Sequence, residues 1–269
     1  MKKSILITGA YGGMGKATAK LLAEQGYRIF ALDRQVKEGS ENIIPIEADI
    51  TDERSVKDAF SRVSNLTDNL FAIIHFAGIY MLDSLVEMES DAFEKIFKVN
   101  LEGAFLVNKV FLPLLEKGSR IVITTSELAP LDPLPFTGIY AITKGALDKY
   151  AYSLRMELQL KEITVSVLRA GAVDTGMLGA STDALDRFIE KTQLYNCNAK
   201  RFKSIVESVE AKNVKPEAIA KKMSKILHKR KPKFAYDINR NRLLLLLNIL
   251  PKRIQLWAIK QVLKNKKGK

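Results

Sequence analysis

Short apolar runs alternate with longer segments of helical periodicity along most of the chain. The runs predict strands at residues 3–8, 28–32, 42–48, 71–75, 120–125, 163–168 and 233–236, and the periodic segments predict helices at 14–25, 52–64, 91–115, 138–160 and 216–229. Continuous apolar strands separated by helices are typical of a parallel sheet that is buried on both faces. The pattern therefore predicts an α/β fold, a doubly wound parallel sheet in a single domain over residues 1–236.

Glycine and polar residues come directly after the predicted strands. They are Gly9, Asp33, Asp49, Gly78, Ser126 and Gly171. Ligands of open parallel sheets bind beyond the carboxyl ends of the strands. These residues therefore predict one ligand site at that edge of the sheet. Residues 174–211 are helical in pattern but poorly bounded, and we expect them to cover this site.

A glycine-rich turn, TGAYGGMG at residues 8–15, joins the first strand to the first helix. In this context glycines let the backbone approach a pyrophosphate, and the helix N-terminus favours its negative charge. Asp33 ends the second strand, where it could accept hydrogen bonds from both ribose hydroxyls and would repel a 2′-phosphate. The alternative for Asp33 is a solvated loop carboxylate. The turn and Asp33 together predict a dinucleotide site that prefers NAD.

Tyr140 and Lys144 lie four residues apart in a predicted helix, which puts both side chains on one helical face. An ammonium beside a phenol favours the phenolate and so lowers the pKa of the phenol. The pair could therefore form a general base at neutral pH. The same spacing occurs by chance in many helices, so its meaning depends on the rest of the chain.

The composition excludes several classes of site. Cys197 is the only cysteine, so neither an intramolecular disulfide nor a thiolate metal site can form. His75 and His228 lie far apart in the sequence, and we expect no metal site. The N-terminal segment breaks into glycines at once and does not look like an export signal. These features favour a cytoplasmic protein.

Positive charge is concentrated in the last quarter of the chain. Residues 1–199 hold 22 Lys and Arg against 26 Asp and Glu, a net of −4, whereas residues 200–269 hold 21 against 4, a net of +17. This asymmetry favours an anionic partner, either a membrane or a nucleic acid. No nucleic-acid reading motif is recognisable there, so we expect no nucleic-acid partner.

Residues 237–269 are predicted to form a basic amphipathic helical tail. The apolar run 243–250 is far too short to span a bilayer, which needs about 20 residues. Arg253, Lys260 and Lys264 form a basic stripe beside an apolar face with Trp257, as in a helix that lies in a membrane interface. Peripheral membrane contact through 240–269 is one expectation. The other is that the leucines pack on the substrate pocket or an oligomer partner.

Taken together, the motifs resemble the short-chain dehydrogenase/reductase family over roughly residues 3–180. The matching residues are Thr8, Gly9, Gly13, Gly15, Asp49, Asn100, Ser126, Tyr140 and Lys144. The resemblance implies a Rossmann-type fold, a nicotinamide cofactor and hydride transfer between an alcohol and a ketone or aldehyde. It also implies a homodimer or homotetramer.

The resemblance assigns four catalytic residues. Tyr140 would be the general acid/base that exchanges a proton with the substrate oxygen, and Lys144 would lower its pKa and hold the nicotinamide ribose. Ser126 would hydrogen-bond the substrate oxygen. Asn100 would hold a water that links Lys144 to solvent. In the absence of these roles, Ser126 would only cap a strand end and Asn100 would pair with backbone.

The resemblance also assigns cofactor contacts. They are Gly9, Tyr11, Gly13, Met14, Gly15, Asp33, Arg34, Asp49, Ile50, Ala77, Gly78, Asn100, Tyr140, Lys144, Val173 and Thr175. Asp33 favours NAD. Arg34 and Lys16 are positive charges that could hold a 2′-phosphate, so NADP is the alternative cofactor.

Three positions depart from the family pattern. His75 stands where the family usually has Asn before x-Ala-Gly, and we expect it to be a buried hydrogen-bonding residue without a catalytic role. Ala170 replaces a proline before Gly171, and the interval from Ser126 to Tyr140 is one residue longer than is commonest. None of these changes removes a catalytic group.

Apolar residues flank the motifs and favour an apolar substrate such as a sterol, a retinoid or an acyl chain. They are Met81, Leu82, Leu131, Leu134, Phe136, Met177 and Leu178. The alternative function is a non-catalytic dinucleotide-binding scaffold or sensor that its basic tail tethers to a membrane. The four intact catalytic residues argue against it.

Overall fold

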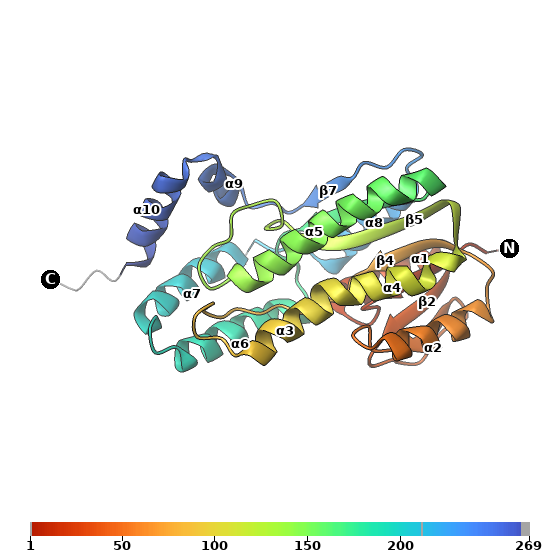
Figure 1. The fold of residues 1–269 in the computed structure, drawn as a ribbon, viewed down its shortest axis with the longest axis horizontal. Helices are drawn as coiled ribbons and strands as arrows, with labels where there is room; N and C mark the ends of the chain where they lie inside the picture. The colour runs from red at the N-terminus through yellow and green to blue at the C-terminus, as the bar shows by residue number, and fades with distance from the viewer. Residues whose placement is uncertain (1, 211, 265–269) are drawn as a thin grey trace.

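The computed structural model describes residues 2–210 and 212–264, and its centre is one parallel sheet of seven strands in the order β3-β2-β1-β4-β5-β6-β7 (Figure 1). The strands are β1 Ser4–Thr8, β2 Arg28–Asp33, β3 Ile43–Glu47, β4 Leu70–His75, β5 Leu115–Ser126, β6 Thr164–Ala170 and β7 Ala235–Ile238. The order changes direction between β1 and β4. Ligands of doubly wound sheets bind at this switch point. The predicted α/β fold is confirmed.

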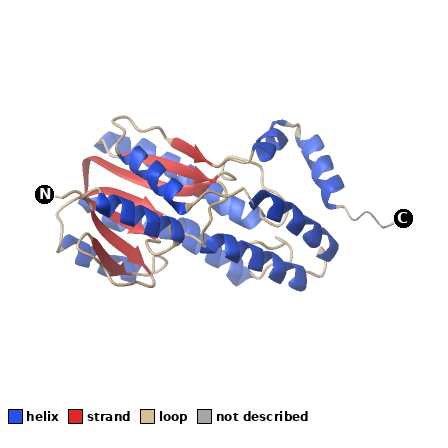
Figure 2. Ribbon diagram, turned by 180° about the vertical axis from the view of Figure 1, so that it is seen from behind, coloured by secondary structure: helices blue, strands red, loops and turns tan. Residues whose placement is uncertain are grey.

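Helices cover both faces of the sheet and bury its apolar strands (Figure 2). One layer holds α1 Gly13–Glu24 and α8 Pro216–Leu227, and the other holds α2 Glu53–Ser64, α4 Gly103–Phe111 and α5 Gly138–Leu158. Leu22 and Met223 pack on the first face, and Val56 and Phe111 pack on the second. Every residue of β1 is buried, as its unbroken apolar run predicts.

The segment predicted as one helix over 91–115 is divided into four pieces. α3 Ser90–Phe97 leads into a π-helical turn, η1 Lys98–Glu102, and α4 then ends in the 3-10 turn η2 Leu112–Leu114. Pro113 lies in η2, where its ring prevents the α-helix from continuing. β5 starts at Leu115, earlier than the expected residue 120, and Gly118 adopts φ +90° within it. The single long helix was therefore a wrong prediction.

The end of the molecule away from the N-terminus is helical (Figure 1). The predicted cover over 174–211 contains α6 Gly176–Lys191 and α7 Asn196–Glu210. Leu82 from the loop after β4 packs with Leu185 and Phe202 of these helices in a third apolar cluster. The cover thus has its own small core beside the carboxyl edge of the sheet.

The basic tail follows β7, which ends at Ile238, slightly beyond the expected boundary at residue 236. It consists of α9 Arg242–Ile249 and α10 Lys252–Leu263. Leu263 and Ile259 pack in the third cluster, so α10 lies against α7. Within residues 2–210 and 212–264, none of the helices has both the length and the apolar character needed to cross a bilayer.

Candidate active site

The glycine turn after β1 is shaped by two close backbone approaches. Gly9 has φ +66°, and a Cβ at this position would lie 2.6 Å from the backbone nitrogen of Ala77. A Cβ on Gly15 would lie 2.1 Å from the carbonyl oxygen of Gly9. Only glycine fits either position, because any side chain would overlap fixed backbone. The turn therefore brings the start of α1 directly beyond the end of β1.

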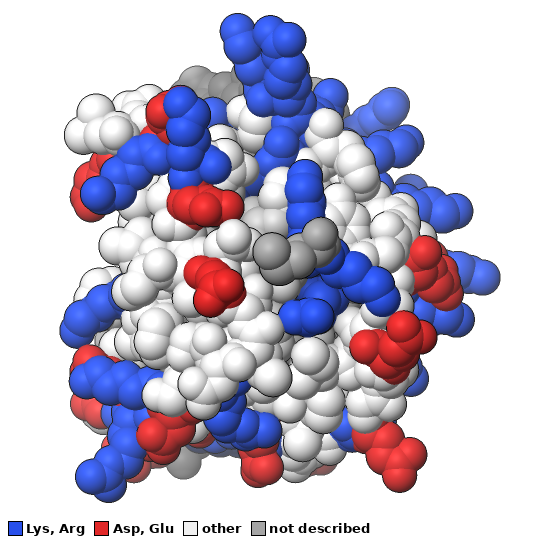
Figure 3. Space-filling model, turned by 90° about the vertical axis from the view of Figure 1, so that its right-hand side faces the viewer, with Lys and Arg blue, Asp and Glu red and all other residues white. Residues whose placement is uncertain are grey.

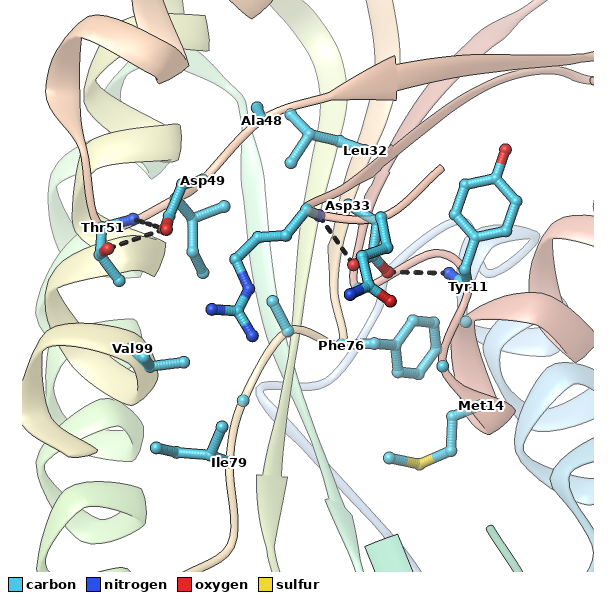
Figure 4. A pocket seen from close by; sticks show the side chains of 18 of the residues that line it. Tyr11, Met14, Leu32, Asp33, Ala48, Asp49, Thr51, Phe76, Ile79 and Val99 are labelled. Carbon is cyan, nitrogen blue, oxygen red and sulfur yellow. Dashed lines mark hydrogen bonds between the residues drawn. The ribbon is translucent and has the colours of Figure 1, made fainter. Parts of the chain in front are cut away.

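A cavity of about 950 Å³ opens at this turn, over the carboxyl ends of β1, β2 and β4 (Figure 4). Most residues expected to bind a cofactor line it: Gly9, Tyr11, Gly13, Met14, Gly15, Asp33, Arg34, Asp49, Ile50, Ala77, Gly78 and Thr175. Lys16 is exposed on α1 and does not contribute to the lining. Val173 is buried behind the cavity, where it forms a bridge with Val214.

The carboxylate of Asp33 is fixed at the end of β2 (Figure 4). One oxygen accepts a hydrogen bond from the backbone N–H of Tyr11 at 3.0 Å, and the other accepts from the N–H of Arg34 at 2.8 Å. Each oxygen keeps acceptor capacity, since a carboxylate can accept about four hydrogen bonds. Asp33 therefore presents an oriented negative charge to the cavity.

Asp49 follows β3 and is held by Thr51, whose backbone N–H and hydroxyl both donate to one carboxylate oxygen at 2.8 and 2.7 Å (Figure 4). Burial acts to raise the pKa of Asp49. The hydrogen bonds from Thr51 and the charges of Arg34 and Lys98 outweigh burial, and the pKa is lowered. Asp49 is therefore ionised at neutral pH, and the positive charge of Arg34 lies near it.

Asn100 lies in the π-helical turn η1 and is almost completely buried. Its side-chain oxygen accepts from the backbone N–H of Ile79 at 2.8 Å, and its amide donates to the carbonyl of Ile79 at 3.0 Å and to Thr143 Oγ1 at 3.1 Å. Single π turns within helices often mark functional sites, because they redirect one side chain. Here the turn directs Asn100 towards the loop after β4 and towards α5.

Lys144 of α5 is buried beside Asn100. Its Nζ donates to the carbonyl oxygen of Thr124 in β5 at 3.5 Å. A Cβ on Gly78 would lie 3.2 Å from both Lys144 Nζ and Asn100 Oδ1, so these groups are directly behind the cavity wall. Burial lowers the pKa of Lys144 to about 8, because the charged ammonium loses its hydration.

Tyr140 lies one helical turn before Lys144, with the lysine Nζ 5.7 Å from the centroid of its ring. Burial raises the pKa of Tyr140, the nearby Tyr80 raises it further, and a hydrogen bond with Ser126 acts in the opposite direction. The expectation that Lys144 would lower this pKa is not met, because desolvation of the phenol is the larger effect. In this structure Tyr140 therefore keeps its proton at neutral pH.

Ser126 ends β5 and brings a buried hydroxyl to Tyr140. Its Oγ also accepts a hydrogen bond from the backbone N–H of Leu128 at 3.2 Å. The structure thus brings Asn100, Ser126, Tyr140 and Lys144 together. They come from three elements at the carboxyl edge of the sheet, just outside the lining of the cavity.

Tyr80 was not predicted from the sequence. It lines the cavity, and its ring centroid is 4.8 Å from that of Tyr140, which does not line it. Lys37 and Lys98 also line the cavity without having been predicted. The position of Tyr80 directly after the Ala-Gly pair and Ile79 is the only sequence signal for it. The side chains of Met177 and Leu178, expected near the substrate, lie outside the described residues.

His75 is buried at the end of β4, as expected. The amide of Asn108 donates to Tyr150 at 3.2 Å, so its oxygen faces His75 Nε2 at 2.9 Å and accepts from it. His75 Nδ1 then accepts from the hydroxyl of Thr8 at 3.4 Å. Burial lowers the pKa of His75 to about 4. The neutral ring therefore joins two strands and α4 and has no contact with the cavity.

Two relatives among known proteins are similar over most of the chain. Estradiol 17-beta-dehydrogenase 2 of Mus musculus is 32% identical over 200 residues, which are 69% of this chain and 52% of that protein. The chain thus spans about half the length of this relative. The 3-ketodihydrosphingosine reductase of Bacteroides thetaiotaomicron is 25% identical over 240 residues, 86% of this chain and 85% of that protein.

Solved structures share the fold. The 3-ketoacyl-(acyl-carrier-protein) reductase from Brucella melitensis complexed with NADH superimposes with a TM-score of 0.71 at 21% identity, over 88% of this chain and 96% of that chain. The NADP-bound structure of ElxO superimposes with a TM-score of 0.70 at 20% identity, over 88% of this chain and 98% of that chain. The model of the family described as short chain dehydrogenase matches residues 3–186, well over half of the chain. The chain therefore belongs to the short chain dehydrogenase family.

Proposed function

We propose that this protein is an NAD(P)-dependent oxidoreductase that interconverts an alcohol and a ketone or aldehyde on an apolar substrate. One observation carries the proposal. A group of four polar side chains lies directly behind the cavity wall, which is formed partly by glycines: Ser126, Tyr140, Lys144 and Asn100. A binding module that only sensed a dinucleotide would have no need of a buried phenol, hydroxyl and ammonium in one group.

The residues present fit a nicotinamide dinucleotide. Gly9 and Gly15 leave no room for a Cβ, which suits close approach of a pyrophosphate to backbone N–H groups and the N-terminus of α1. Asp33 suits ribose hydroxyls, and the residues around Asp49 and Ile50 suit an adenine. We favour NAD, because a 2′-phosphate would be repelled by Asp33. Arg34 is the feature that favours NADP, and proteins of this fold bind either cofactor.

The nicotinamide ring, when bound, supplies or accepts the hydride. The protein handles the proton. In the reductive direction Tyr140 Oη donates its proton to the carbonyl oxygen, which Ser126 Oγ holds by a hydrogen bond. Burial keeps Tyr140 protonated at neutral pH, as a proton donor must be. Lys144 stabilises the phenolate that remains. Asn100 bonds to Thr143 and Ile79 and so holds α5 in register with the loop after β4.

Apolar side chains lie in the loop after β4, where Tyr80 contacts Tyr140, and in the loop before α5. Leu82 is buried and Tyr80 is partly buried, and Phe136 stacks on the cover helices through Phe188, with ring centroids 4.8 Å apart. The relatives named for estradiol and for 3-ketodihydrosphingosine also point to lipid-like ketones and alcohols. We therefore propose a steroid-like or acyl-like substrate.

We also propose that the protein is a homodimer or homotetramer. α4 and α5 carry large apolar side chains that are exposed in the single chain, among them Phe105, Ile142, Tyr152 and Met156. Contact between two copies would remove this surface from water. Light scattering that gives the mass of one chain would contradict this assembly.

The test of the proposed function is the variant Tyr140→Phe, with Tyr152→Phe as control. Tyr152 lies on the same helix and is exposed. We expect Tyr140→Phe to reduce turnover of ketones of increasing chain length and ring count by about 10²–10⁴-fold, because the proton donor is lost. NADH binding should stay unchanged, and Tyr152→Phe should have wild-type activity. Near-wild-type turnover by Tyr140→Phe would refute the mechanism.

A further inference from the structure

α9 exposes an apolar side to solvent. Leu243, Leu246 and Ile249 are 71%, 61% and 78% exposed, and their spacing of three places them on one side of the helix. The other side of α9 is also apolar, with Leu244 and Leu247 partly buried. A helix that is apolar all round is expected to be covered on every side. The protein itself covers only one side of α9.

α10 continues this exposed apolar surface. Ile254, Leu256 and Trp257 are exposed, and Trp257 is 63% exposed although tryptophan is one of the most apolar side chains. Arg253 and Lys260 lie beside them and are exposed as well. We call the exposed side chains Leu243, Leu246, Ile249, Ile254, Leu256 and Trp257 the tail surface. On α10 the basic side chains of Arg253 and Lys260 lie between those of Leu256 and Trp257.

The tail surface is held in place by the body of the protein. Asn248 of α9 accepts a hydrogen bond from the backbone N–H of Asp132 at 2.7 Å, in the loop between Ser126 and Tyr140. The carboxylate of Glu127 accepts from the backbone N–H of Asn241, the N-cap of α9. On α10, Gln255 is buried. These contacts fix which sides of both helices face outwards.

The tail is basic and has no acidic residue of its own. At the end of the molecule that carries the N-terminus, basic and acidic side chains stand side by side (Figure 3). The chain after Asp237 contains no Asp or Glu, but it contains Arg240, Arg242, Lys252, Arg253, Lys260 and Lys264, with further lysines beyond. Lys252 pairs with Asp132 of the body. Arg240 pairs with Asp237. Arg242, Arg253 and Lys260 are exposed on the same two helices as the apolar side chains, and neither helix contains an acidic residue.

The exposed apolar and basic side chains of the tail together favour one kind of binding partner. A second copy of the chain, packed symmetrically, would set Arg242, Arg253 and Lys260 against the same cations of its partner, which opposes association. A bilayer with anionic headgroups matches both features, because leucine and tryptophan enter the interface while Lys and Arg attract the headgroups. We propose that the tail surface docks the protein peripherally on an anionic lipid membrane. The inference does not depend on the proposed redox activity.

Trp257 allows a direct test, because it is the only tryptophan of the chain. We would titrate the full chain with vesicles of phosphatidylglycerol and phosphatidylcholine and record tryptophan emission. We expect a blue shift with phosphatidylglycerol, quenching by brominated lipid, and no change with phosphatidylcholine alone. Unchanged emission with anionic vesicles would overturn the proposal.

The variant Leu243→Asp/Leu246→Asp tests the apolar contribution, and Arg253→Gln/Lys260→Gln tests the charge. We expect the first to weaken vesicle binding by more than about tenfold. The second should weaken it by about fivefold for each charge removed. The control Leu66→Asp/Leu160→Asp changes two exposed leucines outside the tail and should bind as the wild type does.

We expect each variant to fold, because the changed leucines are exposed. Circular dichroism would check this. Equal binding by Leu243→Asp/Leu246→Asp and the wild type would refute the docking role of the tail surface. A lower mass of this variant in light scattering without lipid would show that the surface joins two copies, and would also overturn the proposal.

Discussion

The rings of Tyr80 and Tyr140 lie against one another, with 4.8 Å between their centroids and 56° between their planes. Tyr80 lines the cavity, and Tyr140 is behind it. In the proposed reaction a ketone reaches Tyr140 Oη to receive its proton, so the substrate would share this space with the ring of Tyr80. Tyr80 is therefore placed to select substrates by width.

We expect Tyr80→Ala to raise the ratio of kcat/KM for wide ring ketones to that for short-chain ketones by about tenfold, because the ring no longer limits the space beside Tyr140. Tyr80→Phe keeps the ring and should keep the wild-type ratio. Steady-state kinetics on the two kinds of ketone would measure this ratio of kcat/KM values. The same ratio in Tyr80→Ala and wild type would contradict a selective role for this ring.

Asp33 and Arg34 should set the choice between NADH and NADPH. Asp33→Asn keeps an acceptor for the N–H of Tyr11 but removes the negative charge. We expect it to shift preference towards NADPH by about tenfold or more, because the 2′-phosphate is no longer repelled. Arg34→Gln should shift preference towards NADH. A wild-type protein with a strong preference for NADPH would contradict the assignment of NAD.

Gly15 and Gly12 form a matched pair within the glycine turn. A Cβ on Gly15 would lie 2.1 Å from the carbonyl oxygen of Gly9, whereas one on Gly12 would lie 3.4 Å from it. We expect Gly15→Ala to cost about 1–3 kcal/mol of stability and to abolish cofactor binding, because the backbone of the turn must move. Gly12→Ala should be far milder. Thermal unfolding would measure the stability of both variants, and NADH titration would measure their cofactor binding. Equal effects of Gly15→Ala and Gly12→Ala would show that contact with the backbone of the turn is not the cause of the loss.

His75 should make stability depend on pH in the acid range. Burial lowers its pKa in the folded state to about 4, whereas in the unfolded chain the pKa is near 6.5. Between these values the unfolded chain binds a proton that the folded protein excludes. Stability is therefore lost as pH falls from 6.5 towards 4, by up to about 3 kcal/mol.

Urea unfolding at pH 7 and pH 5 would measure this loss. We expect His75→Asn to reduce it, because asparagine does not titrate, whatever its effect on stability at pH 7. His228→Asn, at the only other histidine, is the control. An unchanged pH dependence in His75→Asn would show that other groups cause the acid loss.

The parts of the fold with simple periodicity could be predicted from the sequence. Unbroken apolar runs predicted the strands, and the helical periodicity over 52–64 predicted α2, which Asp52 caps by accepting from the backbone N–H of Arg54 at 2.9 Å. The glycine turn was predictable because Gly9 and Gly15 have no alternative in such close contacts. His75 was predicted to be buried because it stands where the family pattern has an asparagine.

Other features depend on tertiary contacts that no local pattern shows. The π turn around Asn100 interrupts a segment of helical periodicity, and it is held by hydrogen bonds to Ile79 and Thr143, far away in the sequence. The raised pKa of Tyr140 results from burial, whereas the sequence reveals only the neighbouring Lys144. The tail was expected either to contact a membrane or to pack its leucines on the substrate pocket or an oligomer partner. In the structure each tail helix has one side against the protein and one side exposed, which no local pattern shows.

The hydrogen bond between Glu127 and Asn241 limits how the tail can be studied. Glu127 directly follows Ser126, and burial raises the pKa of its carboxyl, while the N–H of Asn241 and the charge of Arg240 act in the opposite direction. A chain shortened before residue 240 would leave this buried carboxyl without either group, next to Ser126. Deletion of the tail would therefore disturb the proposed active site itself, and loss of activity in a shortened chain would say nothing about membranes.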